Sequence, residues 1–253
     1  MKNFQFKSKA FIPFITAGDP NIDTSKELIL KMQDAGADLI EIGIPFSDPV
    51  ADGPTIQRAI MRALKNGITT DDIFNMLDSI KDEVKILLAI MTYVDPILSY
   101  GSAEFIKRCS EVNIRAIIVP NMSIEQRNKI YSDCQTYNVR LISFLLPTSS
   151  EDLENIATSA EGFLYCVSSL GVTGVRSNLN TNIGSLISQV KKFSDIPCMI
   201  GFGISTPEQA KQMSEISDGV IVGSAIVKII EEQGINSPHY VEEYVREIKN
   251  AIG

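Results

Sequence analysis

Two carboxylates are the residues of this sequence most able to carry chemistry, and eleven positions separate them. Glu41 lies within the apolar run 39–43, and Asp52 follows in the segment Ala51-Asp-Gly-Pro54. Burial favours the neutral form of a carboxyl group, so Glu41 could hold a proton near neutral pH and act as an acid or a base. A second carboxyl group in a more polar loop stays ionised. The pair could therefore divide the two roles of acid–base catalysis.

Each carboxylate also has an ordinary structural explanation. Glu41 could be paired with a Lys or Arg inside the fold, and Asp52, which precedes a glycine, could be a turn residue. Histidine offers little alternative, because His239 is the only one and lies close to the C-terminus. Ser-His-Asp hydrolysis, His-rich metal sites and histidine acid–base catalysis would all depend on that residue. If the chain is an enzyme, we expect carboxylates to carry its proton transfers.

Composition narrows the class of protein and of partner. With 253 residues, of which 44% are hydrophobic and 21% charged, the chain has the composition of a globular protein. The formal charge of −8, with no Lys or Arg run longer than a pair, argues against a nucleic-acid partner. The four cysteines form no Cys-x-x-Cys pair, which favours reduced thiols, and no apolar run is long enough for a membrane span. We expect a cytoplasmic protein that binds neither metal nor membrane.

The elements that must position the carboxylates are indicated by the hydrophobic pattern. Apolar runs alternate with amphipathic segments, and their continuous hydrophobicity is typical of parallel strands covered on the outer face. This pattern predicts a single (β/α)8 TIM barrel with extra short helices, forming one domain over residues 1–253. A doubly wound open sheet remains an alternative, although no glycine-rich turn follows the first run. The eight runs span residues 11–16, 39–43, 86–91, 116–119, 141–145, 163–167, 197–200 and 219–222.

Capping patterns and loop lengths add detail to this prediction. Four helix starts are marked by capping-box patterns, at Thr24, Ser123, Thr148 and Ser205. Two connections after apolar runs are long, residues 44–54 after the second run and residues 168–183 after the sixth. In a TIM barrel the active site lies at the C-terminal ends of the strands. We therefore expect these two connections to be lids or binding loops.

Glycines in the last third of the chain indicate a phosphate site. Gly201-Phe-Gly203 follows the seventh run, Gly223-Ser224 follows the eighth, and Gly171-Val-Thr-Gly174 lies in the second long connection. Glycine lets backbone N–H groups approach a phosphate, and the N-terminus of a helix over residues 225–232 would attract the same anion. Each glycine by itself could equally be a turn.

Two aromatic residues lie beside these glycines. Tyr165 ends the sixth apolar run and Phe202 lies between two glycines, so either could face a ligand or simply pack in the core. The residues alone thus indicate a metal-free barrel enzyme that acts on a phosphorylated substrate through Glu41 and Asp52, and they do not identify that substrate.

Five motifs follow one another in order from about residue 10 to about residue 230. The most specific is Glu41-x-Gly-x-Pro-Phe-Ser-Asp-Pro-x-Ala-Asp-Gly-Pro-x-Ile-Gln57, which contains both carboxylates. The others are Phe14-x-Thr-Ala-Gly-Asp-Pro20, Gly171-Val-Thr-Gly174, Gly201-Phe-Gly-Ile-Ser205 and Gly223-Ser-Ala-Ile-Val227. In these motifs the sequence closely resembles the tryptophan synthase alpha subunit family.

The resemblance implies a reaction and residue roles. The reaction is the retro-aldol cleavage of indole-3-glycerol phosphate to indole and glyceraldehyde 3-phosphate in L-tryptophan biosynthesis, with no metal or organic cofactor. Glu41 matches the family's glutamate that protonates indole C3 and accepts the proton of the glycerol hydroxyl, and Asp52 matches the aspartate that holds the indole N–H. The further matches are Tyr165, Thr173 and Phe202 for substrate binding and Gly174, Gly203, Gly223 and Ser224 for phosphate binding.

The resemblance also implies a partner, the pyridoxal-phosphate-dependent beta subunit, which receives indole through a tunnel in an alpha2-beta2 assembly. Two segments depart from the family pattern. The chain reads Pro120-Asn-Met-Ser123 where the family has Pro-Asp-Leu-Pro, and Tyr93-Val-Asp-Pro96 where Tyr-x-Asn-Pro is usual. Both segments follow strands on the expected docking face, so these departures bear on partner association rather than on the chemistry.

Two other functions are alternatives. The chain could be a weakly active subunit that acts mainly as an allosteric activator of the beta chain, although the intact carboxylates and phosphate glycines argue for catalysis. It could also be another phosphate-binding barrel lyase or isomerase, such as a ribulose-phosphate epimerase. That chemistry needs metal-binding histidines, which this chain lacks.

Overall fold

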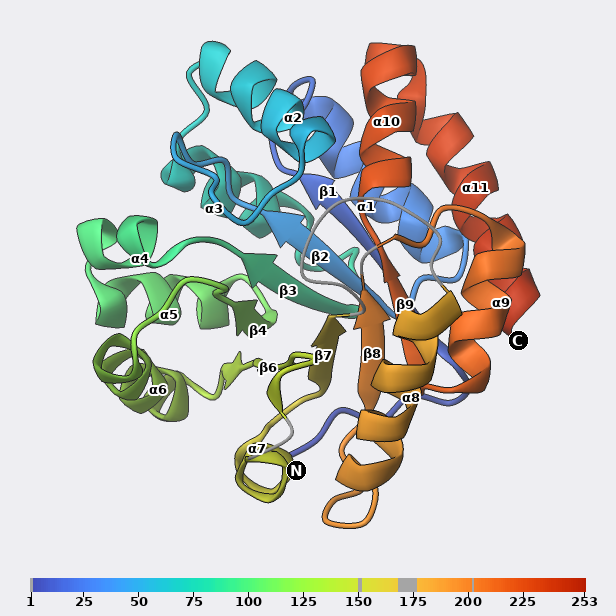
Figure 1. Ribbon diagram of the computed structural model, residues 1–253. Coiled ribbons are helices and arrows are strands. Elements are labelled where there is room, and N and C mark those ends of the chain that lie inside the picture. Colours follow the sequence, from blue (N-terminus) through green and yellow to red (C-terminus); the bar gives the residue numbers. More distant parts are fainter. Residues whose placement is uncertain (1, 150–151, 168–176, 202) are drawn as a thin grey trace.

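The apolar runs of the sequence form one parallel sheet that curls into a nearly closed barrel (Figure 1). The computed structural model describes residues 2–149, 152–167, 177–201 and 203–253. Within these residues the sheet has nine strand segments, in the order β5-β4-β3-β2-β1-β9-β8-β7-β6. The strands are β1 (Ala10–Thr16), β2 (Leu39–Gly43), β3 (Leu87–Met91), β4 (Ile114–Ile118), β5 (Arg140–Leu141), β6 (Ser143–Leu145), β7 (Leu164–Val167), β8 (Cys198–Gly201) and β9 (Gly219–Val222).

The two ends of this strand order are joined by the chain itself. β5 pairs with β4, β6 pairs with β7, and only Ile142 separates β5 from β6. The N–H of Ile142 donates to the Ile117 carbonyl at 3.0 Å, which continues the contact with β4. The run predicted as one strand over residues 141–145 is therefore divided into two segments, each paired with the neighbour on its own side. The predicted TIM barrel is confirmed, with this division as a difference in detail.

Helices cover the outside of the barrel and connect successive strands (Figure 1). Amphipathic sequences form them, so that each helix buries an apolar face against the sheet. In α1, for example, Leu28, Ile29 and Met32 are fully buried. The helices are α1 (Ile22–Asp34), α2 (Pro54–Lys65), α3 (Thr70–Ile80), α4 (Val94–Tyr100), α5 (Ser102–Glu111), α6 (Ile124–Tyr137), α7 (Leu153–Ser159), α8 (Ser177–Val190), α9 (Pro207–Glu215), α10 (Ser224–Gln233), the short 3-10 helix η2 (Gly234–Asn236) and α11 (Ser237–Ile252).

Apolar side chains fill two layers, one between sheet and helices and one inside the barrel. Successive strand residues point to opposite faces of a sheet, so each strand contributes to both layers. In β2, Ile40 and Ile42 belong to the outer layer, whereas Leu39 belongs to the interior. Glu41 has the same parity as Leu39. The strand therefore directs this carboxyl group into the barrel interior.

The predicted helix starts are only partly confirmed. Ser123 caps α6 in a complete capping box with Gln126, as predicted. The starts predicted at Thr24, Thr148 and Ser205 are wrong by one to four positions. In α1 the N–H of Thr24 donates to a side chain further upstream, so Thr24 is inside the helix rather than its cap. The observed N-caps of these three helices are Asn21, Asp152 and Thr206.

The two long connections have different outcomes. Residues 44–53, between β2 and α2, contain no helix or strand, as predicted for a long loop. The second predicted loop is shorter than expected, because α8 begins at Ser177 and occupies residues 177–183. The preceding residues 168–176 lie outside the described residues. Of the two connections, only residues 44–53 are described in full as a loop.

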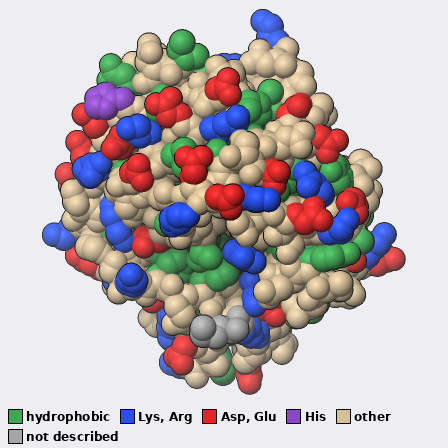
Figure 2. Space-filling view, turned by 180° about the vertical axis from the view of Figure 1, so that it is seen from behind, with side chains coloured by type: hydrophobic (Ala, Val, Ile, Leu, Met, Phe, Trp, Pro, Cys, Tyr) green, Lys and Arg blue, Asp and Glu red, His purple; other side chains and the backbone are tan. Residues whose placement is uncertain are grey.

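The surface carries side chains of both charges, and the cysteines lie in the interior. Acidic and basic side chains are interspersed over the face shown in Figure 2, with no large patch of either charge. All four cysteines are buried and free. Across the described part of the chain, no helix combines the length and the apolar composition that crossing a membrane requires.

Candidate active site

Glu41 lies in the middle of β2, inside the barrel and shielded from water. Its Cα is opposite Phe14 of β1 on one side and Ala89 of β3 on the other. Glu41 is 1% exposed, and neither carboxyl oxygen has a hydrogen-bond partner among the residues that the structure describes. Burial raises the pKa of Glu41 to about 8, and the negative charge of Asp52 adds to this rise. Glu41 is thus a neutral carboxylic acid near pH 7 rather than half of an internal ion pair.

Asp52 lies in the loop between β2 and α2 and has a different environment. The hydroxyl of Tyr93 donates to Oδ2 of Asp52 at 2.6 Å, and the N–H of Ala51 donates to the same hydroxyl oxygen at 2.9 Å. Partial burial raises the pKa of Asp52, while the hydrogen bond from Tyr93 counteracts that rise by stabilising the ionised form. Asp52 is therefore anchored to the residue that follows β3, and it is more than a turn residue.

Tyr165 lies close to both carboxyl groups. It is 5% exposed and belongs to the interior layer, and its pKa is raised first by burial and then by the charges of Glu41 and Asp52. Its ring lies against Gly201 of β8, where a Cβ would come within 2.6 Å of the ring. Gly201 therefore provides the space that the ring occupies. The structure therefore brings Tyr165 close to Glu41 and Asp52, and contact with a ligand stays a prediction.

A pocket opens beside Asp52 at the C-terminal ends of the first three strands. Buried hydroxyl groups at Thr16 and Thr92 border it, and neither hydroxyl has a hydrogen-bond partner among the described residues. Neither threonine was predicted as a site residue: Thr16 belongs to the motif Phe14-x-Thr-Ala-Gly-Asp-Pro20, which gave it no role, and Thr92 lies in no motif. The pocket is lined by Phe14, Thr16, Gly43, Ile44, Asp52, Ile56, Ile60, Met91, Thr92 and Tyr93.

The candidate phosphate residues lie at the same rim of the barrel. Gly223 follows β9 and is the N-cap of α10, which begins at Ser224, and no side chain caps this helix in the described structure. The N–H groups of its first turn are therefore available to an anion. Gly203 follows the neighbouring strand β8 with φ of +78°, and no atom lies within 4 Å of the position that a Cβ would occupy. The rim thus offers open backbone next to a helix N-terminus.

Three of the predicted site residues cannot be placed. Thr173, Gly174 and Phe202 lie outside the described residues. Among the predicted residues that the structure does describe, Glu41, Asp52 and Tyr165 form one group, and Gly203, Gly223 and Ser224 belong to the ends of β8 and β9.

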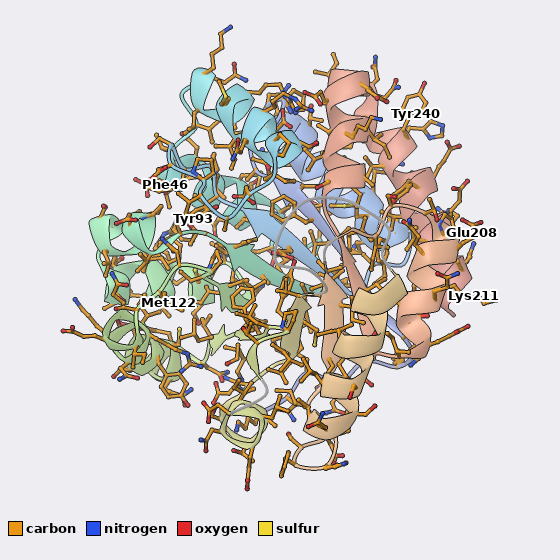
Figure 3. All side chains as sticks on the ribbon, viewed as in Figure 1. Phe46, Tyr93, Met122, Glu208, Lys211 and Tyr240 are labelled. Carbon is orange, nitrogen blue, oxygen red and sulfur yellow. The ribbon has the colours of Figure 1, made fainter. Side chains whose placement is uncertain are left out.

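The loops after β3 and β4, where the sequence departs from the family pattern, are connected to each other. The N–H of Val94 donates to Oδ1 of Asn121 at 2.9 Å. Figure 3 shows Phe46, Tyr93 and Met122 along this part of the rim, and the rings of Phe46 and Tyr93 have centroids 5.5 Å apart. Tyr93 therefore links the loop after β2, which carries Asp52, to the loop after β3.

No group of three His, Cys, Asp or Glu residues that could hold a metal ion is present among the residues the structure describes. The site's own residues supply acid, carboxylate, hydroxyl and backbone N–H groups. Such groups can transfer protons, bind an N–H donor and bind an anion.

Comparison with known proteins identifies the family. The family model for "Tryptophan synthase alpha chain" matches residues 1–252. The chain belongs to this family. Membership of the tryptophan synthase alpha chain family confirms the resemblance that the motif from Glu41 to Gln57 indicated, and the barrel described above is the fold of the family's solved structures.

Individual relatives cover nearly the whole chain. The tryptophan synthase alpha chain of Halalkalibacterium halodurans is 43% identical over 249 residues, which are 97% of this chain and 94% of that one. The crystal structure of tryptophan synthase subunit alpha from Legionella pneumophila matches with a TM-score of 0.87 and 34% identity, over 96% of this chain and 92% of that one. A chain in a structure of tryptophan synthase from M. tuberculosis matches with a TM-score of 0.85 and 28% identity, over 97% and 94%.

Proposed function

We propose that this chain cleaves indole-3-glycerol phosphate to indole and glyceraldehyde 3-phosphate, as its family and its site support. The observation that carries the proposal is the neutral carboxyl group of Glu41, which is buried, has no hydrogen-bond partner among the described residues, and feels the charge of Asp52, a residue that lines the pocket. A retro-aldol cleavage needs one group that can give a proton to carbon and take one from oxygen. A carboxylic acid with a pKa of about 8 can do both near neutral pH.

Glu41 carries out both proton transfers of the reaction. Glu41 donates its proton to C3 of the indole ring, which leaves a positive charge on the ring. The bond between C3 and the glycerol carbon then breaks, and its electron pair returns to the ring as neutral indole. The proton of the adjacent hydroxyl passes to the Glu41 carboxylate as that carbon becomes the aldehyde. Glu41 ends protonated, as it began.

Asp52 stabilises the charge that this sequence creates. Its carboxylate accepts the indole N–H and favours the positively charged ring over the neutral one. The hydrogen bonds from Tyr93 to Asp52 and from Ala51 to Tyr93 hold the carboxylate in one orientation. An ionised group in a fixed position stabilises a developing charge without having to reorganise.

The remaining family matches complete the substrate site. Tyr165 lies beside the reacting atoms, and Thr173 and Phe202, which lie outside the described residues, bind the substrate. The phosphate binds at the open N-terminus of α10. Its ligands are the backbone of Gly174, Gly203 and Gly223 and both the backbone and the hydroxyl of Ser224.

The alpha chain works with a partner that uses indole. We assign this partner as a pyridoxal-phosphate-dependent beta subunit in a cytoplasmic alpha2-beta2 assembly, and residues 1–253 as a single domain that docks onto it as a unit. The rim loops after β2, β3 and β4, tied together through Tyr93 and Asn121, form the docking face. This arrangement puts the exit for indole next to the pocket that releases it.

The test is an assay of indole and glyceraldehyde 3-phosphate released from indole-3-glycerol phosphate by the purified chain, alone and with a beta subunit. We expect equal amounts of both products from the chain alone and faster release with the partner. The proposal would be refuted if neither product formed in both assays, with the chain alone and with the beta subunit added. Stimulation of the beta reaction without any cleavage would instead identify the chain as an activator of its partner.

A further inference from the structure

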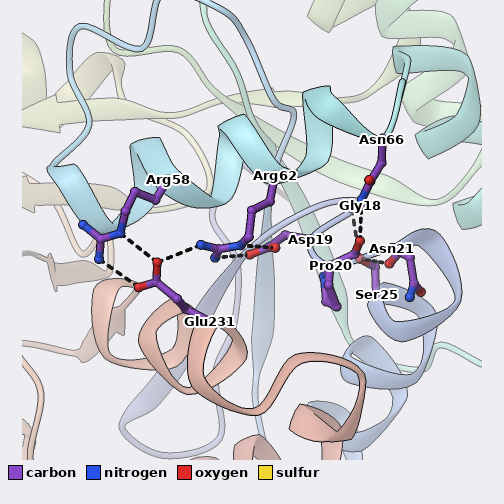
Figure 4. A network of polar contacts seen from close by, with 9 residues as sticks. All are labelled: Gly18, Asp19, Pro20, Asn21, Ser25, Arg58, Arg62, Asn66 and Glu231. Carbon is purple, nitrogen blue, oxygen red and sulfur yellow. Dashed lines mark hydrogen bonds and ion pairs between the residues drawn. The ribbon is translucent and has the colours of Figure 1, made fainter.

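Four charged side chains form a network between helices that begin at the active-site rim (Figure 4). Nε and Nη2 of Arg62 donate to the two carboxylate oxygens of Asp19, both at 2.8 Å, and Nη1 donates to Glu231 at 2.9 Å. Arg58 donates to both carboxylate oxygens of Glu231, at 2.7 and 2.8 Å. We call these four residues, Asp19, Arg58, Arg62 and Glu231, the Arg62 network.

The network joins three elements of the barrel. Asp19 lies in the turn after β1, the two arginines lie on α2, and Glu231 lies on α10. The side chain of Asp19 is 1% exposed, whereas those of Arg62 and Glu231 are 31% and 28% exposed. Isolated surface ion pairs contribute little, but a buried carboxylate held by a two-pronged guanidinium has a defined geometry. The network therefore fixes the orientation of Arg62 between Asp19 and Glu231.

The turn that carries Asp19 is itself fixed to α1. The N–H of Gly18 donates to Oγ of Ser25 at 2.9 Å, and that hydroxyl donates to the carbonyl of Asn21 at 3.1 Å. On the other side, Nδ2 of Asn66 donates to the carbonyl of Pro20 at 2.7 Å, just beyond the end of α2. The turn after β1 thus holds α2 in place on the barrel through Arg62 and Asn66 (Figure 4).

Both helices in the network begin at the proposed site. α2 begins at Pro54, two residues after Asp52, and Nε2 of Gln57 in its first turn donates to the Asp52 carbonyl at 2.9 Å. α10 begins at Ser224, where we place the phosphate. The N-cap of α2 makes no side-chain hydrogen bond, so capping does not fix its position. Beneath the network the two helices share the apolar cluster of Phe14, Ile56, Ala59, Ile60 and Val227.

We propose that the Arg62 network is a positioning device that sets the distance between Asp52 and the N-terminus of α10. This inference rests on the proposed function, in which a single substrate places its indole ring at Asp52 and its phosphate at α10. The two ends of that molecule are joined by a short carbon chain. Both helices must therefore have the correct spacing before Glu41 can reach indole C3, and small misplacements of reacting groups are costly.

The informative variant is Glu231→Gln, because it removes the charge that joins α2 to α10 and leaves the buried pair of Asp19 and Arg62 in place. We expect kcat/KM for indole-3-glycerol phosphate to fall about tenfold or more. Indole alone and glycerol 3-phosphate alone each occupy one end of the site, so their dissociation constants should stay within about twofold. A general loss of structure would weaken all three ligands together.

The matched control is Glu242→Gln. Glu242 also pairs with two cations, Lys31 of α1 and Arg246 of α11, both at 2.9 Å, and its side chain is 18% exposed. It joins two helices and contacts none of the proposed site residues, so its loss should leave kcat/KM within about twofold of the unmodified chain. Equal losses in both variants, or an unchanged kcat/KM in Glu231→Gln, would overturn the inference.

Amide hydrogen exchange gives a readout that does not depend on turnover. The segments that hold the first hydrogen-bonded amides of α2 and α10, Gln57 and Val227, should exchange faster in Glu231→Gln and at the normal rate in Glu242→Gln, because the network restrains the starts of both helices. Unchanged exchange in both segments would refute the positioning role. If the unmodified chain failed to cleave indole-3-glycerol phosphate, the proposed function would fall, and the exchange data alone would decide the role of the network.

Discussion

The strand β2 and the loop that follows it place two carboxyl groups in opposite environments. Glu41 lies within the sheet, is almost fully enclosed and has no hydrogen-bond partner in the described part of the chain. Asp52 is only partly enclosed, on a loop, and bound by the hydroxyl of Tyr93. The comparison teaches that one short segment can supply both an acid that keeps its proton and a carboxylate that is held ready for a positive charge. Burial sets the first property and hydrogen bonding the second.

The strongest test of the comparison is Glu41→Gln, which keeps the size of the side chain and removes only proton exchange. We expect kcat to fall by about 10²–10⁴-fold, with KM for indole-3-glycerol phosphate and the thermal midpoint nearly unchanged. Steady-state kinetics and thermal unfolding measure these quantities. Glu161→Gln is the control, because Glu161 is also buried but binds Tyr131 and Gln135 away from the pocket. Turnover of Glu41→Gln within a few-fold of the unmodified chain would remove the assigned role.

Asp52→Asn should have a smaller but still large effect. Loss of the negative charge that faces the indole ring should lower kcat about 100-fold. Because the charge of Asp52 also contributes to the raised pKa of Glu41, the pKa of Glu41 should fall below about 8 in this variant. The alkaline limb of the kcat/KM profile should then move to lower pH. An alkaline limb that stays in place would show that the charge of Asp52 does not raise the pKa of Glu41, which would contradict the prediction.

Tyr93→Phe sharpens the comparison by removing the hydrogen bond that distinguishes the two carboxylates. A hydrogen bond to a charged group contributes about 1.5–3 kcal/mol, so kcat/KM should fall about tenfold. The same hydrogen bond holds the pKa of Asp52 down, so its loss should raise that pKa and shift the acidic limb of the profile to higher pH. Tyr100→Phe is the control, since its hydroxyl binds Asp71 at the surface. Identical profiles for the two variants would contradict the role of Tyr93.

The smallest expected effect is on stability. The unfolded chain ionises Glu41 near pH 4.5, whereas the folded chain holds the proton to about pH 8, so the folded state binds more protons between these values. Its free energy of unfolding should therefore fall as pH rises through this window and level off above it. Relative to Glu41→Gln, the unmodified chain should lose about 1 kcal/mol between pH 7 and pH 8. Urea unfolding at the two pH values measures the difference, and a constant difference would show that Glu41 is not held neutral.

The fold was predictable from the sequence, and Glu41 could be selected from it as the candidate acid. The apolar runs correspond to the strands because hydrophobic periodicity depends on local sequence alone. The division at Ile142 was not predictable, because it arises from two different pairing partners, β4 and β7. The helix starts at Asn21 and Thr206 were missed because Ser, Thr and Asn are nearly equivalent as N-caps, so neighbouring positions compete.

The candidate site was predictable in its residue types and not in its contacts. Glu41 was selected because a carboxylate in an apolar strand is unusual, but the sequence did not show that its register neighbours are Phe14 and Ala89, whose side chains cannot form hydrogen bonds. The hydrogen bond from Tyr93 to Asp52 spans 41 positions, and no local pattern encodes it. The segment beginning at Tyr93 was associated with partner docking, whereas the structure also connects it to Asp52.

The ring of Phe14 is shared between the two ends of the site. A Cβ at Gly43 would come within 2.7 Å of this ring, and a Cβ at Gly223 would come within 3.4 Å of it. The same ring lies opposite Glu41 in the sheet and in the cluster under α2 and α10. A substitution that changes the size of this single side chain would therefore alter the pocket for the ring and the start of α10 together.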